Sequence, residues 1–573
     1  MKTLVKPRRG VVLEATLYVM FLLAVVIAIA VGTVLVVQRA SGVDYRNTRV
    51  NYAAEAGADA VMAQLEADMA TGPISAAQLA ALTPPSLAGF TFDNVSAVST
   101  GTLAPRQITD GAYAGLYALI TNYDITSEVH DPLGNRGGAI VSVKAQAIPI
   151  FQFGIFYEKD LEINNGPPMN FAGWIHSNGN IYLSSTDSYF HDAITTPNNV
   201  YHNRKDTNDP ENGSTIDNDA GTPNPITFDS RSLPVPAAFR AASHAAFSDR
   251  LKTNAYGVDS LKVPLPTGVP PVTVILPRNA GDDQQLQRAK FSWKADWYIE
   301  LPSATLLAGQ QCTGGAIPGG ASTRSGGKGL PSVADCATIF SHSRYWDGRE
   351  GRMVDALDID AGNLNAWSLA NPANAPAILY VTVPGWQNQS VLATTYHAIR
   401  VVNGATLNAP LTIATNLPLY VKGNFNLNLN WRSASLIGDA IIIQSNAWND
   451  LAHQAQGVTS AASTEINAAI LAGSWPTACD WFVCGTNPYG GGVENFPRFL
   501  EDWGGKTLTY RGSLVSMHYS LQTFGPWTGA YGGYYSPPNR QWQFDTRFSD
   551  PSNLPPGTPV VGSLVQTAFR PAY

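Results

Sequence analysis

A long apolar stretch near the N-terminus constrains this chain more than any other feature of its sequence. Between Val11 and Val37 the only charged residue is Glu14. The stretch exceeds the roughly 20 residues that a helix needs to cross the hydrocarbon core of a bilayer. Four basic residues precede it: Lys2, Lys6, Arg8 and Arg9. Because basic flanks stay on the cytoplasmic side, the sequence predicts one membrane-spanning helix with the rest of the chain on the opposite side.

The helical pattern continues beyond the apolar stretch. Apolar residues recur there mostly at helical spacings, at Val43, Val50, Ala54, Ala58, Val61, Met62, Leu65 and Met69. Such spacing is typical of an amphipathic helix. The segment Thr71-Gly72-Pro73 is a helix stop, since proline cannot continue a helix. We therefore expect a basic leader at residues 1–10 and one helix over residues 11–70.

Composition narrows the class of the remaining chain. Lys and Arg number 36 against 43 Asp and Glu, which gives a net charge of -7. No basic surplus is present to neutralise phosphates, so nucleic-acid binding is not favoured. Hydrophobic residues make up 45% and charged residues 14%, which is not the composition of a disordered chain. At 573 residues the chain is expected to hold two or three domains.

The pattern of short apolar segments predicts an α+β, mainly β protein. Residues 74–150 are expected to form a small mixed α/β domain, with strands at 90–92, 113–120 and 139–147 packed on the amphipathic part of the helix. From residue 151 to 573, short apolar segments alternate with Gly and Asn turns. Such units can stack into a parallel β-solenoid, with a β-sandwich as the alternative. Residues 184–380 interrupt the pattern and are expected to hold insertions.

Several segments resemble those of a known family. Arg9-Gly10 directly before the apolar helix resembles a prepilin peptidase site, with cleavage between Gly10 and Val11. Residues 52–59, Tyr-Ala-Ala-Glu-Ala-Gly-Ala-Asp, resemble the helix continuation of PilX-type minor pilins of type IV pili. Segments at 176–180, 419–424, 445–450, 494–501 and 535–540 resemble the large ectodomains that follow such N-termini in bacteria.

The resemblance implies a structural and adhesive role in pilus assembly and surface contact, without enzyme activity. The helix would sit in the bacterial inner membrane until assembly extracts it into the filament, and the C-terminal part would lie outside the cytoplasm, on the pilus or cell surface. Its partners would be other pilins and the pilus assembly machinery. The alternative is a helix that serves only as a single-span anchor.

Glu14 is the candidate assembly residue. In pilins a glutamate five residues into the mature chain is thought to pair with the N-terminal amine of the neighbouring subunit. Glu14 is the fourth residue after Gly10, one position short of that pattern. A carboxylate within a membrane span is costly and tends to be functional. The alternative interpretation is a solvated carboxylate near the lipid headgroups.

The four cysteines form two local pairs, Cys312 with Cys336 and Cys479 with Cys484. In an exported chain this arrangement predicts two disulfides that close short loops. A zinc site is the alternative, but neither pair has the Cys-x-x-Cys spacing that is usual for zinc.

No strong catalytic motif or cofactor site is present in the sequence. A polar loop holds the weak calcium candidates Asp206, Asn208, Asp209 and Glu211, whose oxygens are of the type that calcium prefers. The spacing does not match the EF-hand template, and a solvated loop is the alternative.

Two further groups of residues give hypotheses about ligands. A C-terminal aromatic set can either stack on sugars, as part of a surface or glycan site, or cap the core: Trp527, Tyr531, Tyr534, Tyr535 and Trp542. The alternative function is a membrane-anchored envelope enzyme that acts on polysaccharides, a lyase or hydrolase on a β-solenoid. Its candidate carboxylates are Asp439, Asp450, Glu494, Glu501 and Asp502.

Overall fold

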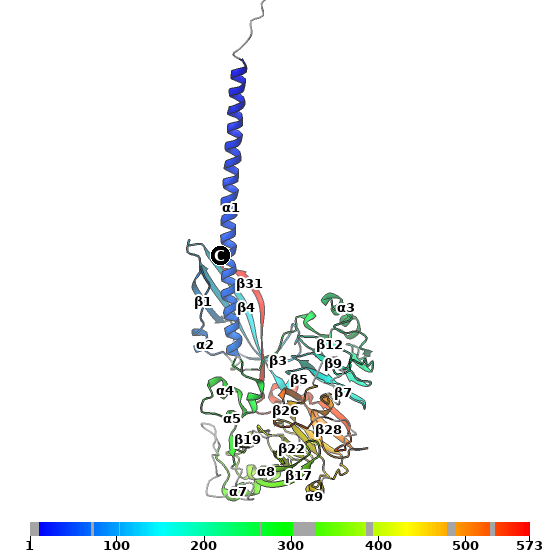
Figure 1. The fold of residues 1–573 in the computed structure, drawn as a ribbon. Helices are drawn as coiled ribbons and strands as arrows, with labels where there is room; N and C mark the ends of the chain where they lie inside the picture. The colour runs from blue at the N-terminus through cyan, green and yellow to red at the C-terminus, as the bar shows by residue number, and fades with distance from the viewer. Residues whose placement is uncertain are drawn as a thin grey trace, which may run out of the picture.

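The structure is a computed structural model. It describes residues 11–69, 74–101, 104–263, 265–266, 268–301, 328–385, 393–455, 457–477, 489–525, 527 and 533–572. Figure 1 shows a long helix, a small sheet beside the second half of that helix, and a large β-rich body at the far end. We call the sheet the stalk sheet and the part from β5 to β30 the body.

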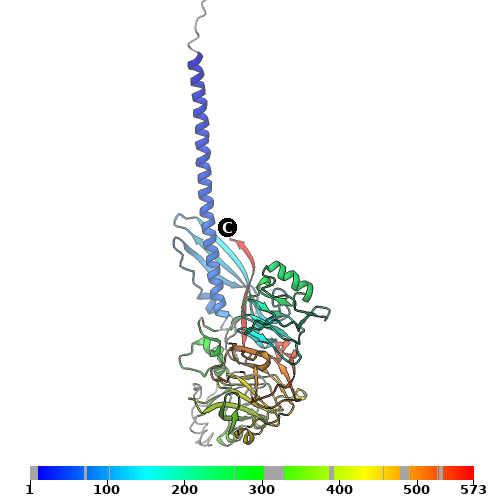
Figure 2. The same ribbon diagram turned by 45° about the vertical axis from the view of Figure 1, so that its right-hand side comes forward.

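Helix α1 (Val11–Met69) confirms the predicted helix. In both views its first half stands clear of the rest of the molecule (Figures 1 and 2). Its second half buries one face against the stalk sheet, with Val50, Ala54, Ala58, Val61 and Leu65 at most 1% exposed. One continuous helix therefore has two different surroundings.

The stalk sheet is antiparallel and lies against α1. It consists of β1 (Thr91–Ser99), β2 (Ala104–Gln107), β3 (Tyr117–His130), β4 (Arg136–Pro149) and β31 (Val560–Pro571), and the short helix α2 (Ala76–Ala80) precedes it. Alternate residues of β3 and β4 are buried against the helix, among them Tyr123, Ile125, Val141 and Val143. This is the half-buried pattern expected of such a sheet.

Strand β31 brings the C-terminal end of the chain back to the stalk. It pairs with β4 in an antiparallel register from Val560↔Pro149 to Pro571↔Ala139. The sequence predicts these residues as part of the β-rich region at 151–573, because they lie at the end of that region along the chain. The body is therefore joined to the stalk sheet by two connections, one at each end of the body.

The first part of the body consists of sets of three strands. The strands are β5 (Phe153–Tyr157), β6 (Leu161–Ile163), β7 (Met169–Phe171), β8 (Trp174–Ser177), β9 (Ile181–Leu183), β10 (Ser188–Phe190), β11 (Ile194–Thr195), β12 (Val200–Tyr201) and β13 (Ser214–Asp217). Each strand of one set pairs in parallel with the corresponding strand of the next set.

A mixed segment separates the two parts of the body. Its elements are β14 (Pro223–Pro225), α3 (Pro236–Phe247), β15 (Leu251–Lys252), α4 (Gln284–Ala289), α5 (Phe291–Lys294) and β16 (Trp297–Glu300), with α7 (Val333–Ile339) after it, together with short 3-10 turns at Asn254–Tyr256 and Pro271–Ile275. This is the main break in the strand pattern within the range 184–380, although β10 to β13 also fall in that range.

The second part of the body is again dominated by parallel strands. They are β17 (Phe340–Asp347), β18 (Arg352–Asp360), β19 (Ile378–Thr382), β20 (Thr395–Val402), β21 (Leu411–Ala414), β22 (Leu419–Lys422), β23 (Ala434–Ile437), β24 (Ile441–Gln444), β25 (Thr464–Asn467), β26 (Ala469–Ser474), β27 (Pro497–Phe499), β28 (Thr507–Gly512), β29 (Leu514–Tyr519) and β30 (Asn539–Phe544). Helices α8 (Ala361–Ala370) and α9 (Asp450–Gln454) lie at the end of the body far from α1 (Figure 1).

One sheet joins the two parts. In the order β15-β11-β8-β5-β29-β26-β23-β21-β19-β16, all neighbours are parallel. The chain enters this long sheet in its middle at β5, runs outward to β15, resumes at the opposite end with β16, and returns to lie beside β5 at β29. The first and last strands that the chain adds to the long sheet, β5 and β29, are therefore direct neighbours.

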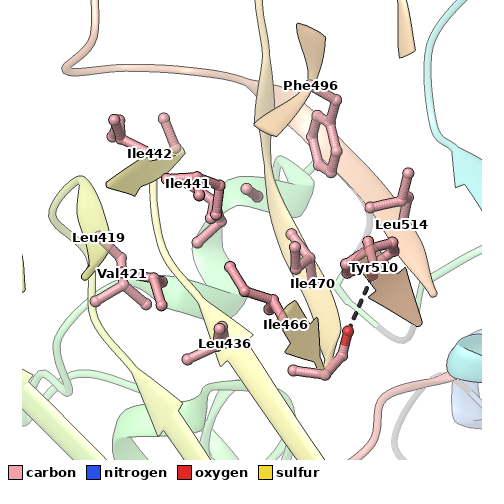
Figure 3. Packing of buried hydrophobic residues seen from close by; sticks show 14 of the residues in the cluster. Leu419, Val421, Leu436, Ile441, Ile442, Ile466, Ile470, Phe496, Tyr510 and Leu514 are labelled. Carbon is pink, nitrogen blue, oxygen red and sulfur yellow. Dashed lines mark hydrogen bonds between the residues drawn. The ribbon is translucent and has the colours of Figure 1, made fainter. Parts of the chain in front are cut away.

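The long sheet is buried on both faces. On one face a row of large apolar side chains runs across neighbouring strands, including Ile413, Leu436, Ile470, Leu514 and Ile155. Figure 3 shows Leu436, Ile470 and Leu514 in the core with side chains from other strands. The opposite face carries the second core, which includes Tyr380, Ile437 and Phe156. Burial of both faces explains why these strands have nearly continuous apolar sequences.

Candidate functional site

The apolar half of α1 is the most distinctive surface of the molecule. Its side chains are exposed throughout, with Val12 at 70%, Phe21 at 69% and Ile29 at 62%. The helix is long and apolar enough to cross a membrane, and none of its most apolar window is buried within the protein. At a rise of 1.5 Å per residue, residues 11–37 extend about 40 Å, which exceeds the roughly 30 Å of a hydrocarbon core.

Glu14 lies in the first turn of this helix and is exposed. Among the described residues no cation pairs with its carboxylate. The first turn also presents backbone N–H groups without helical partners, and these favour a negative charge nearby. Gly10 lies outside the described residues, and Val11 is the first residue of α1. The predicted cleavage between them stays a prediction.

The C-terminal end of α1 contacts the body as well as the stalk sheet. The Lys262 ammonium donates to Glu66 Oε1 at 2.8 Å, and Gln285 Nε2 donates to the Ala67 carbonyl at 3.4 Å. Sequence reasoning missed these contacts, since residues 196 and 218 positions apart give no local signal. The exposed half of the helix thus continues from a segment that contacts both the stalk sheet and the body.

The calcium candidates Asp206, Asn208, Asp209 and Glu211 do not converge. The Asp206 carboxylate accepts two hydrogen bonds from the Arg204 guanidinium, at 2.9 and 2.8 Å. The Asn208 side-chain oxygen accepts from Arg231 at 3.0 Å. Among the described residues no group of three or more His, Cys, Asp or Glu side chains is placed to hold a metal ion. Arginines engage Asp206 and Asn208, and Asp209 accepts from the Thr207 hydroxyl, so these oxygens do not form the expected cluster.

Of the four cysteines, the structure describes Cys336 alone. Cys336 lies in α7, is fully buried, and is not a free thiol. Cys312, Cys479 and Cys484 lie outside the described residues, so the two disulfide pairings stay predictions.

Two of the enzyme-candidate carboxylates hold parts of the body together. The buried Asp439 carboxylate accepts from the backbone N–H groups of Leu521 and Gln522, at 2.7 and 2.9 Å, and burial raises its pKa. Asp450 accepts from the buried Arg400 at 2.7 Å. Burial is the largest influence and opposes ionisation of Asp450, but the hydrogen bond and charge of Arg400, together with the Lys422 charge and the Trp448 hydrogen bond, outweigh it and lower the pKa.

The other three candidates are engaged in the same way. Glu494 is buried and accepts from the Tyr489 hydroxyl at 2.8 Å, and burial raises its pKa. Glu501 accepts from the backbone and hydroxyl of Ser445. Asp502 is exposed and accepts from the Gly504 N–H at 3.0 Å. Each of the five carboxylates thus accepts hydrogen bonds from neighbouring groups of the fold.

The C-terminal aromatic residues form core rather than surface. Tyr534, Tyr535 and Trp542 are at most 6% exposed, and Trp527 packs against the same core with its Nε1–H donating to the Tyr535 hydroxyl at 2.8 Å. Tyr531 lies outside the described residues. The four described aromatic residues therefore fit the prediction that this set caps the core. Their rings do not make an open stacking surface for sugars.

Together the fold and this surface define a class: an elongated protein with one exposed apolar helix and a large β-rich body. Comparison of the chain with protein-family models, curated proteins and solved structures finds no match.

Proposed function

We propose that this chain is a structural, minor-pilin-like component of a type IV pilus or related filament, with roles in assembly and surface contact. One observation carries the proposal. Among the described residues the apolar half of α1 has no packing partner, while the same helix continues into a packed stalk. An exposed apolar surface of this size has to be covered by something else.

In this proposal, two environments cover the apolar half of α1, one before assembly and one after it. Before assembly the bilayer covers the apolar half, with the basic leader in the cytoplasm and the body on the outer side of the bacterial inner membrane. After cleavage next to Gly10, similar helices of other pilins replace the lipid. Glu14 then meets the new N-terminal amine of a neighbouring subunit, and this pairing would offset the cost of a carboxylate among apolar helices.

We infer further that the body is an irregular parallel β-solenoid. The parallel pairing of successive strand sets and the two buried faces of the long sheet support this inference. The body is much wider than the helix that carries it (Figure 1). Repetition along a shaft would bring neighbouring bodies into collision, and this supports the proposal that the subunit sits at the filament tip, where the body would face other surfaces.

N-terminal sequencing tests the proposal. The protein is purified from membranes of cells with and without prepilin peptidase. We expect the mature chain to begin at Val11 when the peptidase is present and at Met1 when it is absent. A chain that begins at Met1 in both strains would contradict the proposal and leave a simple membrane-anchored protein.

A pair of matched variants tests Glu14. Glu14→Gln removes the carboxylate, and we expect normal cleavage but at least a several-fold loss of the protein from purified filaments. Asp44→Asn makes the same chemical change at an exposed position farther along α1 and should leave incorporation unchanged. Equal incorporation of both variants would remove Glu14 from assembly.

A further inference from the structure

A groove lies where the two parts of the body meet. Within the part of the chain that the structure describes, the long sheet alone is continuous across this boundary, through the pairing of β5 with β29. On another side of the body, β7 ends one sheet and β30 ends another within the described residues. The two strands lie close together but do not pair, and residues of both line one opening in the surface. The opening has a volume of about 640 Å³, within the range of small-ligand sites.

The wall formed by β28 and β30 presents polar side chains in rows. Along β30 the residues alternate, so that Asn539, Gln541 and Gln543 point to solvent while the residues between them are buried. The parallel register places Thr509 beside Gln541 and Arg511 beside Gln543. Because neighbouring strands are about 4.8 Å apart, the amides, hydroxyl and guanidinium form a regular array of donors and acceptors.

The opposite wall and the floor complete the groove. Asn170 is exposed on β7, and its side-chain oxygen lies 3.3 Å from His191 Nε2. Asp217 Oδ2 lies 2.8 Å from His191 Nδ1 and so holds the ring in place. Ala172, Trp542 and Phe544 also line the groove, but Trp542 and Phe544 are only 5% and 9% exposed, so their rings belong mainly to the core beneath it. The exposed polar side chains of the two walls suit the hydroxyls at the edge of a sugar ring.

Arg511 gives the groove its charge preference. Among the described residues no hydrogen bond or ion pair engages its guanidinium, whereas the nearby His191 already faces a carboxylate. A guanidinium without a partner matches a carboxylate in the fork geometry that makes such pairs strong. The rows of uncharged amides and hydroxyls beside it suit the hydroxyls of the same ligand.

We propose that this groove binds an acidic polysaccharide, with a uronate carboxylate on Arg511 and sugar hydroxyls on Gln541, Gln543 and Asn170. The proposal names the ligand class for the surface-contact part of the proposed function and rests on that function for its setting. Binding itself is a property of the body and needs no filament. Sequence reasoning missed the groove, because its walls come from strands more than 300 residues apart and only the alternation along residues 539–544 gives a local signal.

The test measures binding of the full chain in detergent micelles by calorimetry. The probes are hexamers of galacturonate, mannuronate and glucuronate-containing hyaluronan, each beside its methyl-esterified form, which keeps the hydroxyls and removes the charge. We expect at least one acidic hexamer to bind, and its ester to bind at least about tenfold more weakly, as loss of one charge-assisted contact predicts. Binding to none of the three would overturn the proposal.

Variants locate the site. Arg511→Gln should weaken binding of the acidic hexamer about tenfold and leave binding of the ester unchanged, while Gln541→Ala should weaken both. Lys506→Gln removes an exposed cation that precedes β28 but does not line the groove, and it should bind as the wild type does. Equal weakening by Arg511→Gln and Lys506→Gln would show general charge attraction and contradict a site at Arg511.

The two proposals fail separately. If the mature chain begins at Val11 but binds no acidic hexamer, the filament role stands and the groove proposal is wrong. If the chain begins at Met1 in every strain but binds through Arg511, the groove proposal stands and the filament role is wrong. Thermal unfolding midpoints of the variants within a degree or two of the wild type establish that lost binding is not lost folding.

Discussion

Glu162 in strand β6 is a carboxylate with almost no contact with water. The Thr477 hydroxyl donates to its Oε2 at 2.8 Å. Burial raises the pKa of Glu162 to about 7, although the nearby Lys205 ammonium and the Thr477 hydrogen bond act in the opposite direction. Lys205 itself is paired with Asp160 at 2.9 Å, so it compensates Glu162 only in part.

This raised pKa makes a prediction about stability and pH. Between the ordinary value of 4.5 and about 7 the folded chain binds more protons at Glu162 than the unfolded chain does. Stability from this group is therefore fully present below pH 4.5, falls as the pH rises to 7, and stays lower above it. Glu162→Gln removes the effect, so the variant should gain up to about 3 kcal/mol relative to the wild type between pH 4.5 and 8.

Thermal unfolding midpoints of both proteins across that pH range measure the difference. Asp44→Asn, an exposed carboxylate-to-amide change on α1, is the control and should follow the wild-type curve. A constant difference between Glu162→Gln and wild type at every pH would contradict a carboxyl that titrates near 7.

Predictions about single residues were correct where the structure around a residue depends mainly on its neighbours along the chain. The long exposed run of α1 is one such case, because helix periodicity and apolarity are local properties. The acidic residues are the opposite case. Asp206 and Asp450 are held by Arg204 and Arg400, and only the second of these partners is distant in sequence. The type and spacing of an acidic residue do not reveal which cation its carboxylate meets.

At the scale of elements, β31 carries a role that its position at the end of the chain does not reveal. It pairs along most of β4, and Val561 near its start is fully buried in the core that also covers one face of the long sheet. The stalk sheet thus depends on strands from both ends of the chain. Because β31 follows the whole body, this sheet is complete only after the body has been synthesised.

Truncation of the chain after Pro559 tests that dependence. The variant lacks β31, so the backbone groups of β4 that pair with it lose their partners. We expect amide hydrogen exchange within residues 139–149 to become at least about tenfold faster, whereas amides of β22 and β24 in the body keep their protection. Hydrogen exchange with mass spectrometry gives both readings.

A shorter truncation is the control. Loss of residues 571–573 leaves nearly all of the β4–β31 register intact and should change exchange only at the end of β4. Unchanged exchange throughout β4 in the long truncation would mean that β31 contributes nothing to the stalk sheet.

At the scale of the whole molecule, the entry of the chain into the middle of the long sheet couples its two parts. Leu514 of β29 lies between Ile470 of β26 and Ile155 of β5, and it is 4% exposed. The side chain therefore packs at the boundary between segments that are about 360 positions apart. If either part of the body unfolds, the apolar side chains that it covers on the other part become exposed at this contact.

Leu514→Ala tests the coupling. Removal of a buried leucine side chain costs about 2–5 kcal/mol through lost burial and the cavity left behind. We expect faster amide exchange in β5 and β8 as well as in β26, although β5 and β8 precede the mutation by more than 300 residues. Hydrogen exchange with mass spectrometry in all three strands shows how far the destabilisation extends from Leu514.

Leu521→Ala is the matched control, because this leucine lies in the same region of the chain but is 52% exposed. Its effect should stay within about 0.5 kcal/mol. Faster exchange in β26 alone after Leu514→Ala would show that the two parts of the body unfold independently.

The sequence by itself determined the long helix, its apolar first half, the small sheet beside its second half and the strand-rich character of the rest. These properties follow from periodicity and composition within short windows, where each residue's neighbours in space are also its neighbours in sequence. The tertiary structure alone decided that β31 returns to β4, that β5 meets β29, and that β7 and β30 form the walls of one groove. The physical reason is that such contacts depend on shape and burial across hundreds of residues, and no local pattern records which two distant strands will close the same surface.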